Sequence, residues 1–243
     1  MSRNFEEIDF QDTDIGEVIL QRRRFQELGD LDVFEVKLNE EYLMSSIFTV
    51  GEVALSEMGL DALDMKDGSA KVVVGGLGLG YTAEAALAHP VTGDLLVVEF
   101  LSPVIDWHQR HLVPIKGSVA DHPHCRLSQG DFFGRALNPD VGLDPENPGT
   151  RYDAILLDVD HSPSRHLRGF RGGFYQIEGL KKLAQNLRPG GIFALWSDDL
   201  ADPEFMQDLE AVFDEVWNEP VFFPNPMDGG EESNSVYIAR TAK

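Results

Sequence analysis

A glycine-rich run directly after a short stretch of valines constrains the fold more than any other feature of the sequence. Residues 72–74 are Val-Val-Val, which is typical of a strand buried on both faces, and Gly-Gly-Leu-Gly-Leu-Gly follows at 75–80. A helix is predicted over residues 82–88. Glycines let the backbone approach a ligand closely, and a helix N-terminus offers unpaired N–H groups. We therefore expect an α/β domain with a ligand-binding turn after its first core strand.

Strand and helix patterns alternate along most of the chain. Predicted strands cover residues 71–74, 94–99, 126–127, 154–157 and 192–196, with late strands at 216–223 and 235–239, and predicted helices cover 48–63, 82–88, 103–111, 173–187 and 202–212. This alternation predicts a Rossmann-like, doubly wound, mainly parallel sheet with helices on both faces. Residues 138–150, with their Pro, Gly and Asp content, are predicted to be a loop and the segment most prone to disorder.

A smaller β-rich unit precedes this domain. Residues 16–25 and 32–44 carry alternating and β-branched apolar residues on either side of the turn-forming stretch Leu28-Gly29-Asp30. We therefore divide the chain into a short N-terminal β appendage at 1–47 and a Rossmann-like, ligand-binding domain at 48–243.

The net charge of the chain limits the classes of partner that it is expected to bind. The chain has 42 acidic and 20 basic residues, and its formal net charge of −22 repels phosphate backbones and anionic membrane surfaces. No nucleic-acid or membrane partner is therefore expected, whereas a cationic substrate is compatible with the charge. No stretch approaches the roughly 20 apolar residues of a membrane helix, and the first residues lack the pattern of a signal peptide, so we expect a cytoplasmic protein. The sequence leaves the oligomeric state open, and a homodimer is compatible with it.

Two acidic residues follow later strands at positions suited to a nucleoside. Glu99 ends the strand at 94–99, about 20 positions after the glycines, where a carboxylate can accept both ribose hydroxyls. Asp131 lies just past the next strand, where it can accept the adenine amino group, although a plain Gly-Asp turn is the alternative. The predicted cofactor-binding residues are Gly75, Gly76, Gly78, Gly80, Glu99, Gly130 and Asp131.

A dinucleotide site is the main alternative for this turn. Its G-x-G-x-x-G/A pattern, counted from Gly76, places the bulky Tyr81 where packing of the helix on the strand favours a small residue. The pattern also fails when counted from Gly78. The form G-x-G-x-G with a strand-ending acid is instead the one that adenosyl-sulfonium enzymes use, so S-adenosylmethionine or its decarboxylated form is the expected donor.

Together these residues resemble the spermidine synthase family of polyamine aminopropyltransferases, within the wider class I S-adenosylmethionine-dependent methyltransferase fold. The resemblance covers most of the chain, including the β unit before the core and a late Pro/Gly loop. Its motifs are Gly75-Gly76 with Gly80, Val98-Glu99, Gly130-Asp131, Tyr-Asp-Ala-Ile-Leu-Leu-Asp at 152–158, Phe174-Tyr175, and Leu-Arg-Pro-Gly-Gly at 187–191.

The resemblance implies that Glu99 binds the ribose, that Asp131 binds the adenine, and that Asp158 assists deprotonation of the attacking amine. An amine attacks carbon only as its free base, so a carboxylate in the crevice is needed to hold the cation and draw its proton away. Asp160 and His161 are the further catalytic candidates, because the family's second Asp aligns with His161 here.

A second departure from the family lies in the glycine turn. The family has an Asp there that pairs with the amine of decarboxylated S-adenosylmethionine, and Gly78 takes its place in this chain. Without that acid, ordinary S-adenosylmethionine, whose carboxylate it would repel, becomes admissible as the donor.

Further acids follow the strand at 192–196 or, like Glu231 and Glu232, fall in the late loop, and they are expected to line one acidic pocket for a small cationic amine. The predicted substrate-binding residues are Ser197, Asp198 and Glu231. No metal is predicted, because Asp158, Asp160, His161 and His166 lack the spacing that fixes metal ligands on a helix or strand.

The sequence thus predicts an enzyme of polyamine biosynthesis, a transferase that moves an aminopropyl group from decarboxylated S-adenosylmethionine to an amine such as putrescine. Proximity of donor and amine and the management of one proton would supply the rate. Two alternatives stay open. One is a methyltransferase with an undetermined acceptor, favoured by Gly78 and His161, and the other is a nucleoside-binding relative without catalytic activity.

Overall fold

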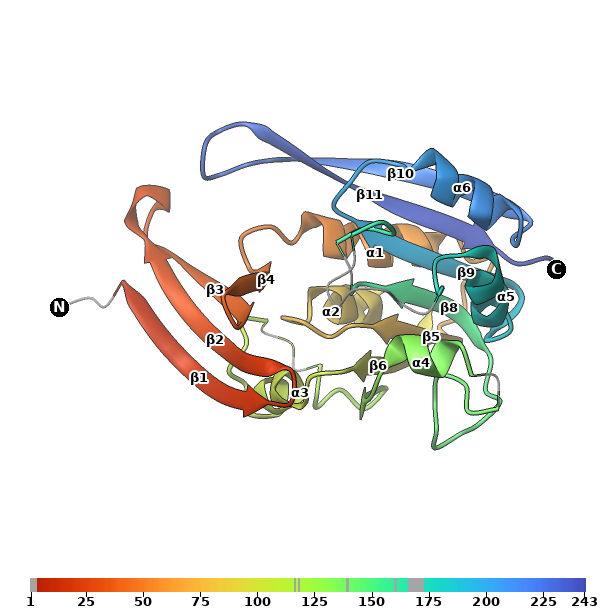
Figure 1. Cartoon of the computed structure of the whole chain (residues 1–243), viewed down its shortest axis with the longest axis horizontal. Helices are drawn as coiled ribbons and strands as arrows, with labels where there is room; N and C mark the ends of the chain where they lie inside the picture. The colour runs from red at the N-terminus through yellow and green to blue at the C-terminus, as the bar shows by residue number, and fades with distance from the viewer. Residues whose placement is uncertain (1–3, 116, 118, 139, 160, 166–172) are drawn as a thin grey trace.

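Two sheets dominate the computed structural model, which describes residues 4–115, 117, 119–138, 140–159, 161–165 and 173–243. A four-stranded antiparallel sheet near the N-terminus faces one end of a seven-stranded, mainly parallel sheet, as Figure 1 shows. No helix in the described part of the chain combines the length and the apolarity that crossing a membrane requires.

The N-terminal sheet has more strands than the sequence predicts. It consists of β1 (Phe5–Thr13), β2 (Gly16–Phe25), β3 (Leu31–Leu38) and β4 (Glu41–Ser45) in that order, with the short 3-10 helix η1 (Gln26–Leu28) between β2 and β3. β1 escapes prediction because a shift of register between Glu7 and Asp9 interrupts its alternation. The predicted segment 32–44 is two strands, since Asn39 turns the chain with a φ of 55°.

The main sheet confirms the predicted fold class. Its order is β10-β11-β9-β8-β5-β6-β7, and the parallel strands are β5 (Ala70–Gly75), β6 (Thr92–Glu99), β7 (Cys125–Gln129), β8 (Tyr152–Leu157) and β9 (Leu187–Ser197). The antiparallel hairpin of β10 (Glu215–Pro224) and β11 (Glu231–Arg240) completes one edge through pairing of β11 with β9. Chain order reverses beside β5, which has β6 on one side and β8 on the other, and this reversal opens a crevice at the carboxyl ends of these strands.

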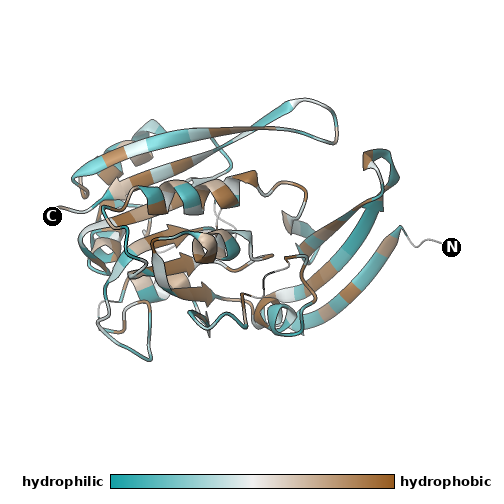
Figure 2. Cartoon of the chain, turned by 180° about the vertical axis from the view of Figure 1, so that it is seen from behind, coloured by the Kyte–Doolittle hydropathy of each residue, from teal (hydrophilic) through white to brown (hydrophobic). Residues whose placement is uncertain are grey.

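Helices pack on both faces of the main sheet. They are α1 (Val50–Asp61), α2 (Tyr81–Ala88), α3 (Ser102–Gln109), α4 (Phe132–Ala136), α5 (Ile177–Ala184) and α6 (Pro203–Glu210). Within β5, Val72 and Val74 join the apolar cluster on one face and Val73 joins the cluster on the other, as the two-residue period of a strand requires. Figure 2 shows that the central strands of the main sheet are hydrophobic, whereas hydrophobic and hydrophilic residues alternate along the strands of the N-terminal sheet.

Two predicted segments differ from the observed elements, and the loop predicted at 138–150 agrees with them. The helix predicted over 173–187 is shorter, because Phe174 and Tyr175 pack edge-on against Phe133 before α5 begins, and the chain already enters β9 at Leu187. Residues 225–230 form the late loop, so Glu231 and Glu232 lie within β11 and not in that loop. The described residues of 138–150 form turns without helix or strand, tied to β7 by an ion pair of Arg126 with Asp144.

Candidate functional site

A cavity of about 480 Å³ is lined by residues of both sheets. The carboxyl ends of β5, β6 and β8 form its core side, where the chain order reverses. The N-terminal sheet supplies an apolar wall that includes Ile15, Leu43 and Met44. The small sheet is therefore part of the site.

Close approach of two backbones explains the first glycines of the turn. The N–H of Asp158 donates to the carbonyl oxygen of Gly75 at 2.8 Å, and the N–H of Gly76 donates to that of Val98 at 2.9 Å. Gly76 has a φ of 93°, and a Cβ at this position would collide with the carbonyl oxygen of Asp158. Gly76, Gly78 and Gly80 line the cavity, whereas Gly75 packs against Phe132.

Glu99 lies beneath this turn and is held by it. Its two carboxylate oxygens accept hydrogen bonds from the N–H groups of Leu77 at 2.8 Å and Leu101 at 2.7 Å, and the side chain is 7% exposed. Burial raises the pKa of Glu99, while the backbone N–H groups oppose that rise. The N–H groups of Gly78 and Phe100 act on the same carboxylate, so four consecutive or neighbouring backbone donors surround Glu99. A diphosphate would need these backbone N–H groups, but they are already bonded to Glu99, whose negative charge would repel it.

Asp131 has both a capping role and a place at the cavity. Its Oδ1 accepts a hydrogen bond from the N–H of Phe133 at 3.1 Å, which makes it the N-cap of α4. The side chain is exposed and lines the cavity together with Gly130. The N–H of Gly130 donates to the carbonyl oxygen of Glu99 at 2.8 Å, so the two predicted nucleoside acids lie on adjoining segments.

Asp158 directly follows β8 and lies between the glycine turn and α2. The hydroxyl of Thr82, in the first turn of α2, donates to its Oδ2 at 2.5 Å. Burial raises the pKa of Asp158 to about 6; the Thr82 hydrogen bond opposes this rise, and the nearby charge of Glu99 adds to it. A carboxyl group with this pKa is ionised at neutral pH and is closer to the pKa of an efficient general base than an ordinary Asp.

The other predicted catalytic and substrate-binding residues are only partly brought together. His161 and Asp198 line the cavity. Ser197 is fully buried beside it, where its hydroxyl oxygen accepts a hydrogen bond from the N–H of Asp199. Glu231, the first residue of β11, does not line the cavity, whereas the next residue, Glu232, does. Asp160 and His166 lie outside the described residues.

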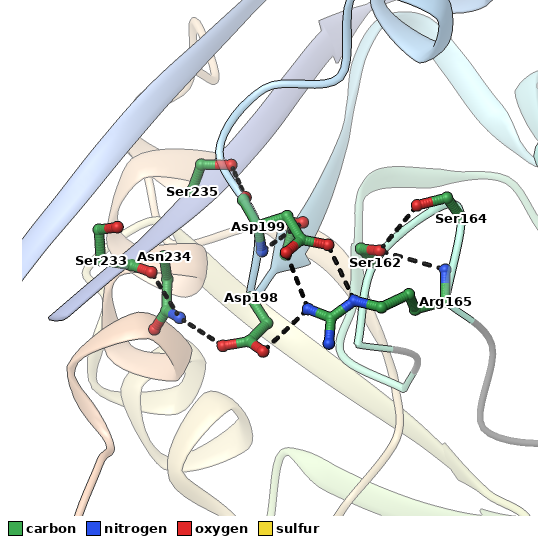
Figure 3. A network of polar contacts seen from close by, with 9 residues as sticks. Ser162, Ser164, Arg165, Asp198, Asp199, Ser233, Asn234 and Ser235 are labelled. Carbon is green, nitrogen blue, oxygen red and sulfur yellow. Dashed lines mark hydrogen bonds and ion pairs between the residues drawn. The ribbon is translucent and has the colours of Figure 1, made fainter.

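A network of ion pairs, drawn in Figure 3, joins the loop after β8 to the end of β9. The guanidinium of Arg165 donates to Asp199 at 2.9 and 3.0 Å and to Asp198 at 3.0 Å. The other oxygen of Asp198 accepts from the Asn234 amide at 3.3 Å. Asp198, predicted to bind substrate, is therefore already paired with an internal cation.

Sequence reasoning missed three residues that shape the cavity. Glu52 lies in the first turn of α1 and lines the cavity near Asp158. Met44 of β4 covers the glycine turn, with its sulfur 2.8 Å from where a Cβ of Gly78 would lie. His108 of α3 donates from Nε2 to the carbonyl oxygen of Gly78 at 2.9 Å, and burial lowers its pKa, which keeps the ring neutral.

Within the described residues, no three His, Cys, Asp or Glu side chains gather in an arrangement that could hold a metal ion.

Comparisons with known proteins agree on the architecture. No family model matches the sequence. A crystal structure of a spermidine synthase in complex with the transition state analogue AdoDATO is similar at a TM-score of 0.70 and 16% identity, covering 97% of this chain and 74% of that one. The spermidine synthase from Thermotoga maritima is similar at a TM-score of 0.68 and 15% identity, covering 97% and 72% of the two chains.

A probable spermidine synthase from Corynebacterium glutamicum is also similar, at a TM-score of 0.61 and 15% identity over 97% of this chain and 79% of that one. Each alignment spans nearly the whole chain, so it includes the N-terminal sheet as well as the main sheet. The chain therefore has the fold of the spermidine synthases.

Proposed function

We propose that this chain is a spermidine synthase-like transferase that moves an aminopropyl group from decarboxylated S-adenosylmethionine to a small cationic amine such as putrescine. The observation that carries the proposal is the placement of Asp158 in the cavity, beside the glycine turn and next to Glu99. A carboxylate in this place serves a reaction that needs a nucleoside on one side and an amine on the other.

The binding half of the mechanism uses the glycine turn and two acids. Glu99, which lines the cavity beneath the turn, accepts the ribose hydroxyls, and Asp131 accepts the adenine amino group at the cavity wall. Gly76 and its neighbours let the ligand lie close to the backbone. This arrangement fixes the donor so that its reactive carbon faces Asp158.

The chemical half requires one bond to form, one to break and one proton to move. The amine nitrogen forms a bond to the propyl carbon next to sulfur, the carbon–sulfur electron pair returns to the sulfonium, and methylthioadenosine leaves as a neutral thioether. Asp158 draws away the proton of the attacking ammonium, and its raised pKa suits that role. Holding the two reactants at attack distance supplies much of the remaining rate.

Methyl transfer from S-adenosylmethionine is the second candidate, and one observation favours it. Met44 covers Gly78, so an apolar side chain lies where the family has an acid for the amine of the decarboxylated donor. A site without that acid does not repel the carboxylate of S-adenosylmethionine.

The test measures binding and turnover separately. Calorimetry should detect binding of methylthioadenosine, and incubation with decarboxylated S-adenosylmethionine and putrescine should give a product heavier by one aminopropyl unit on mass analysis. Asp158→Asn should bind methylthioadenosine nearly as well as wild type while turnover falls roughly 10²- to 10⁴-fold. The exposed Asp214 offers a matched control, since Asp214→Asn removes the same charge away from the cavity.

Three outcomes would contradict the proposal. Equal turnover in Asp158→Asn would remove the catalytic assignment. Methylation of an acceptor with S-adenosylmethionine, in the absence of aminopropyl transfer, would favour the second candidate. Binding of methylthioadenosine without transfer to any amine would leave a nucleoside-binding protein.

A further inference from the structure

Within the described residues, Glu52 is an enclosed carboxylate with no cation beside it, as are Glu99 and Asp158, but those two accept hydrogen bonds from other residues. Other enclosed acids are paired with a cation, as in Glu35 with Arg23, Asp144 with Arg126, and Asp153 with Arg188. Within the described residues, Glu52 accepts a hydrogen bond from its own backbone N–H and has no Lys, Arg or His partner. An enclosed carboxylate without a counter-ion is costly, so its place in the cavity calls for a ligand of opposite charge.

The neighbour of Glu52 across the cavity is a second acid. Asp158 is close enough to repel it, so that burial first, and the charge of Asp158 second, raise the pKa of Glu52 to about 8. Asp158 is in turn repelled by Glu99. Three acids, from α1, from β6 and from the residue that follows β8, thus line the same cavity, and one of them is the predicted nucleoside acid Glu99.

The glycine turn offers no side chain that could replace Glu52 as an anion. Gly78 has no side chain, and Met44 fills the space above it. Asp198, at the far side of the cavity, is neutralised by Arg165. Among the described residues that line the cavity, Glu52 is consequently a carboxylate that can meet a cation next to Asp158 without first displacing a partner.

We propose that Glu52 is the anionic partner of the acceptor's ammonium group, which leaves Asp158 to accept the proton that the attacking amine gives up. The inference rests on the proposed function and adds a specificity-determining residue to it. The acceptor it selects is an amine that is protonated in solution, and a neutral acceptor such as an alcohol gains nothing from Glu52.

This assignment couples amine binding to proton release. Between about pH 6 and pH 8 the carboxyl groups of Glu52 and Asp158 hold one proton between them, because their pKa values are raised to about 8 and about 6. An ammonium group stabilises both carboxylates and lowers their pKa values, so binding expels up to one proton. The other titratable groups that line this cavity are Tyr81 of α2, Glu99 of β6, Asp131, His161, Asp198, and Glu232 of β11.

The experiment titrates putrescine into protein already saturated with methylthioadenosine, in two buffers of different ionisation enthalpy at pH 7.5. Wild type should bind putrescine and release a fraction of a proton. Glu52→Gln should bind putrescine at least about tenfold more weakly and release almost no proton, since the charged hydrogen bond is lost. Its affinity for methylthioadenosine should stay within about twofold of wild type, which also verifies that it folds. Glu57→Gln removes a charge from the exposed face of the same helix and should match wild type.

The two proposals fail in different ways. If wild type binds methylthioadenosine but no amine, the proposed function is wrong and the role of Glu52 falls with it. If wild type binds putrescine and Glu52→Gln binds it equally well with equal proton release, the role of Glu52 alone is overturned. If Glu52→Gln weakened the binding of decarboxylated S-adenosylmethionine but not that of putrescine, the role of Glu52 would also be overturned, because Glu52 would then bind the donor's amine.

Discussion

Gly78 shows how one residue can decide which donor the cavity accepts. Its φ of 51° lies in the left-handed region, which Asp tolerates better than most residues, and the sulfur of Met44 lies 2.8 Å from the place of its Cβ. An acid at this position therefore needs Met44 to be shortened. The pair of residues offers a direct test of the difference between the two candidate donors.

We predict that the double variant Gly78→Asp with Met44→Ala shifts donor preference toward decarboxylated S-adenosylmethionine. The new carboxylate would attract its ammonium group and repel the carboxylate of S-adenosylmethionine, so the ratio of the two dissociation constants should change about tenfold or more. Calorimetry with both donors measures this ratio. Met44→Ala alone is the control, and an unchanged ratio in the double variant would show that the donor's tail does not lie beside Gly78.

Residues of the glycine turn were predictable because their constraints are local. A buried strand, a turn and a helix follow one another in the sequence, and Glu99 ends the next strand at a fixed distance. Glu52 and Met44 were not predictable in this way, since each faces the cavity only through long-range packing. In the sequence Glu52 is an ordinary polar residue of a mainly apolar helix, and nothing near it indicates that α1 brings this side chain to the cavity that Asp158 lines.

At the scale of elements, the loop after β8 depends on Arg165 for its connection to β9. Arg165 pairs with Asp198 and Asp199 in exposed positions, and the N–H of Asp198 donates to the carbonyl oxygen of His161 at 2.8 Å. Exposed ion pairs contribute little to stability and are readily exchanged for another cation. In the proposed reaction, Arg165 would therefore compete with the distal charge of a diamine for Asp198.

We predict that Arg165→Gln lowers the apparent KM for a diamine severalfold and leaves that for a monoamine of equal length nearly unchanged. The free Asp198 would then attract the second ammonium group, which a monoamine lacks. Steady-state kinetics with both amines measures the difference, and Arg151→Gln, an exposed arginine away from the cavity, is the control. A KM that rises for both amines would mean that Arg165 acts by positioning the loop that carries His161.

Element types were predicted better than element ends. The apolar runs of β5, β6 and β8 specify buried parallel strands by themselves. By contrast, β1 has a register shift after Glu7, and the segment before α5 is packed by the rings of Phe174 and Tyr175. The first depends on how β1 pairs with β2 and the second on how these rings pack against Phe133, and a periodic pattern cannot report either.

For the whole molecule, the cavity exists because the N-terminal sheet is anchored to the main domain. Asp9 of β1 accepts a hydrogen bond from the indole N–H of Trp107 at 2.7 Å and pairs with Arg110 at 3.2 Å. Trp107 is fully buried in α3, which packs on β6 and β7. Burial opposes ionisation of Asp9, but hydrogen bonds from Gln11, Trp107 and Arg110 prevail and lower its pKa. One carboxylate thus connects the apolar wall to the side of the cavity that holds the nucleoside acids.

We predict that Asp9→Ala destabilises the protein by about 1–3 kcal/mol, because the buried indole N–H of Trp107 loses its acceptor. The exposed Asp12 of the same strand is the matched control, and Asp12→Ala should unfold like wild type in urea. Because the pKa of Asp9 is lower in the folded than in the unfolded protein, its contribution to stability is present above the ordinary pKa of an Asp and is lost as pH falls through the folded-state pKa. The stabilities of Asp9→Ala and Asp12→Ala should therefore converge in acid. If the wall is needed for binding, Asp9→Ala should also weaken methylthioadenosine under conditions where the protein stays folded. Weakened stability with unchanged affinity would instead mean that the main domain holds the nucleoside without the N-terminal sheet.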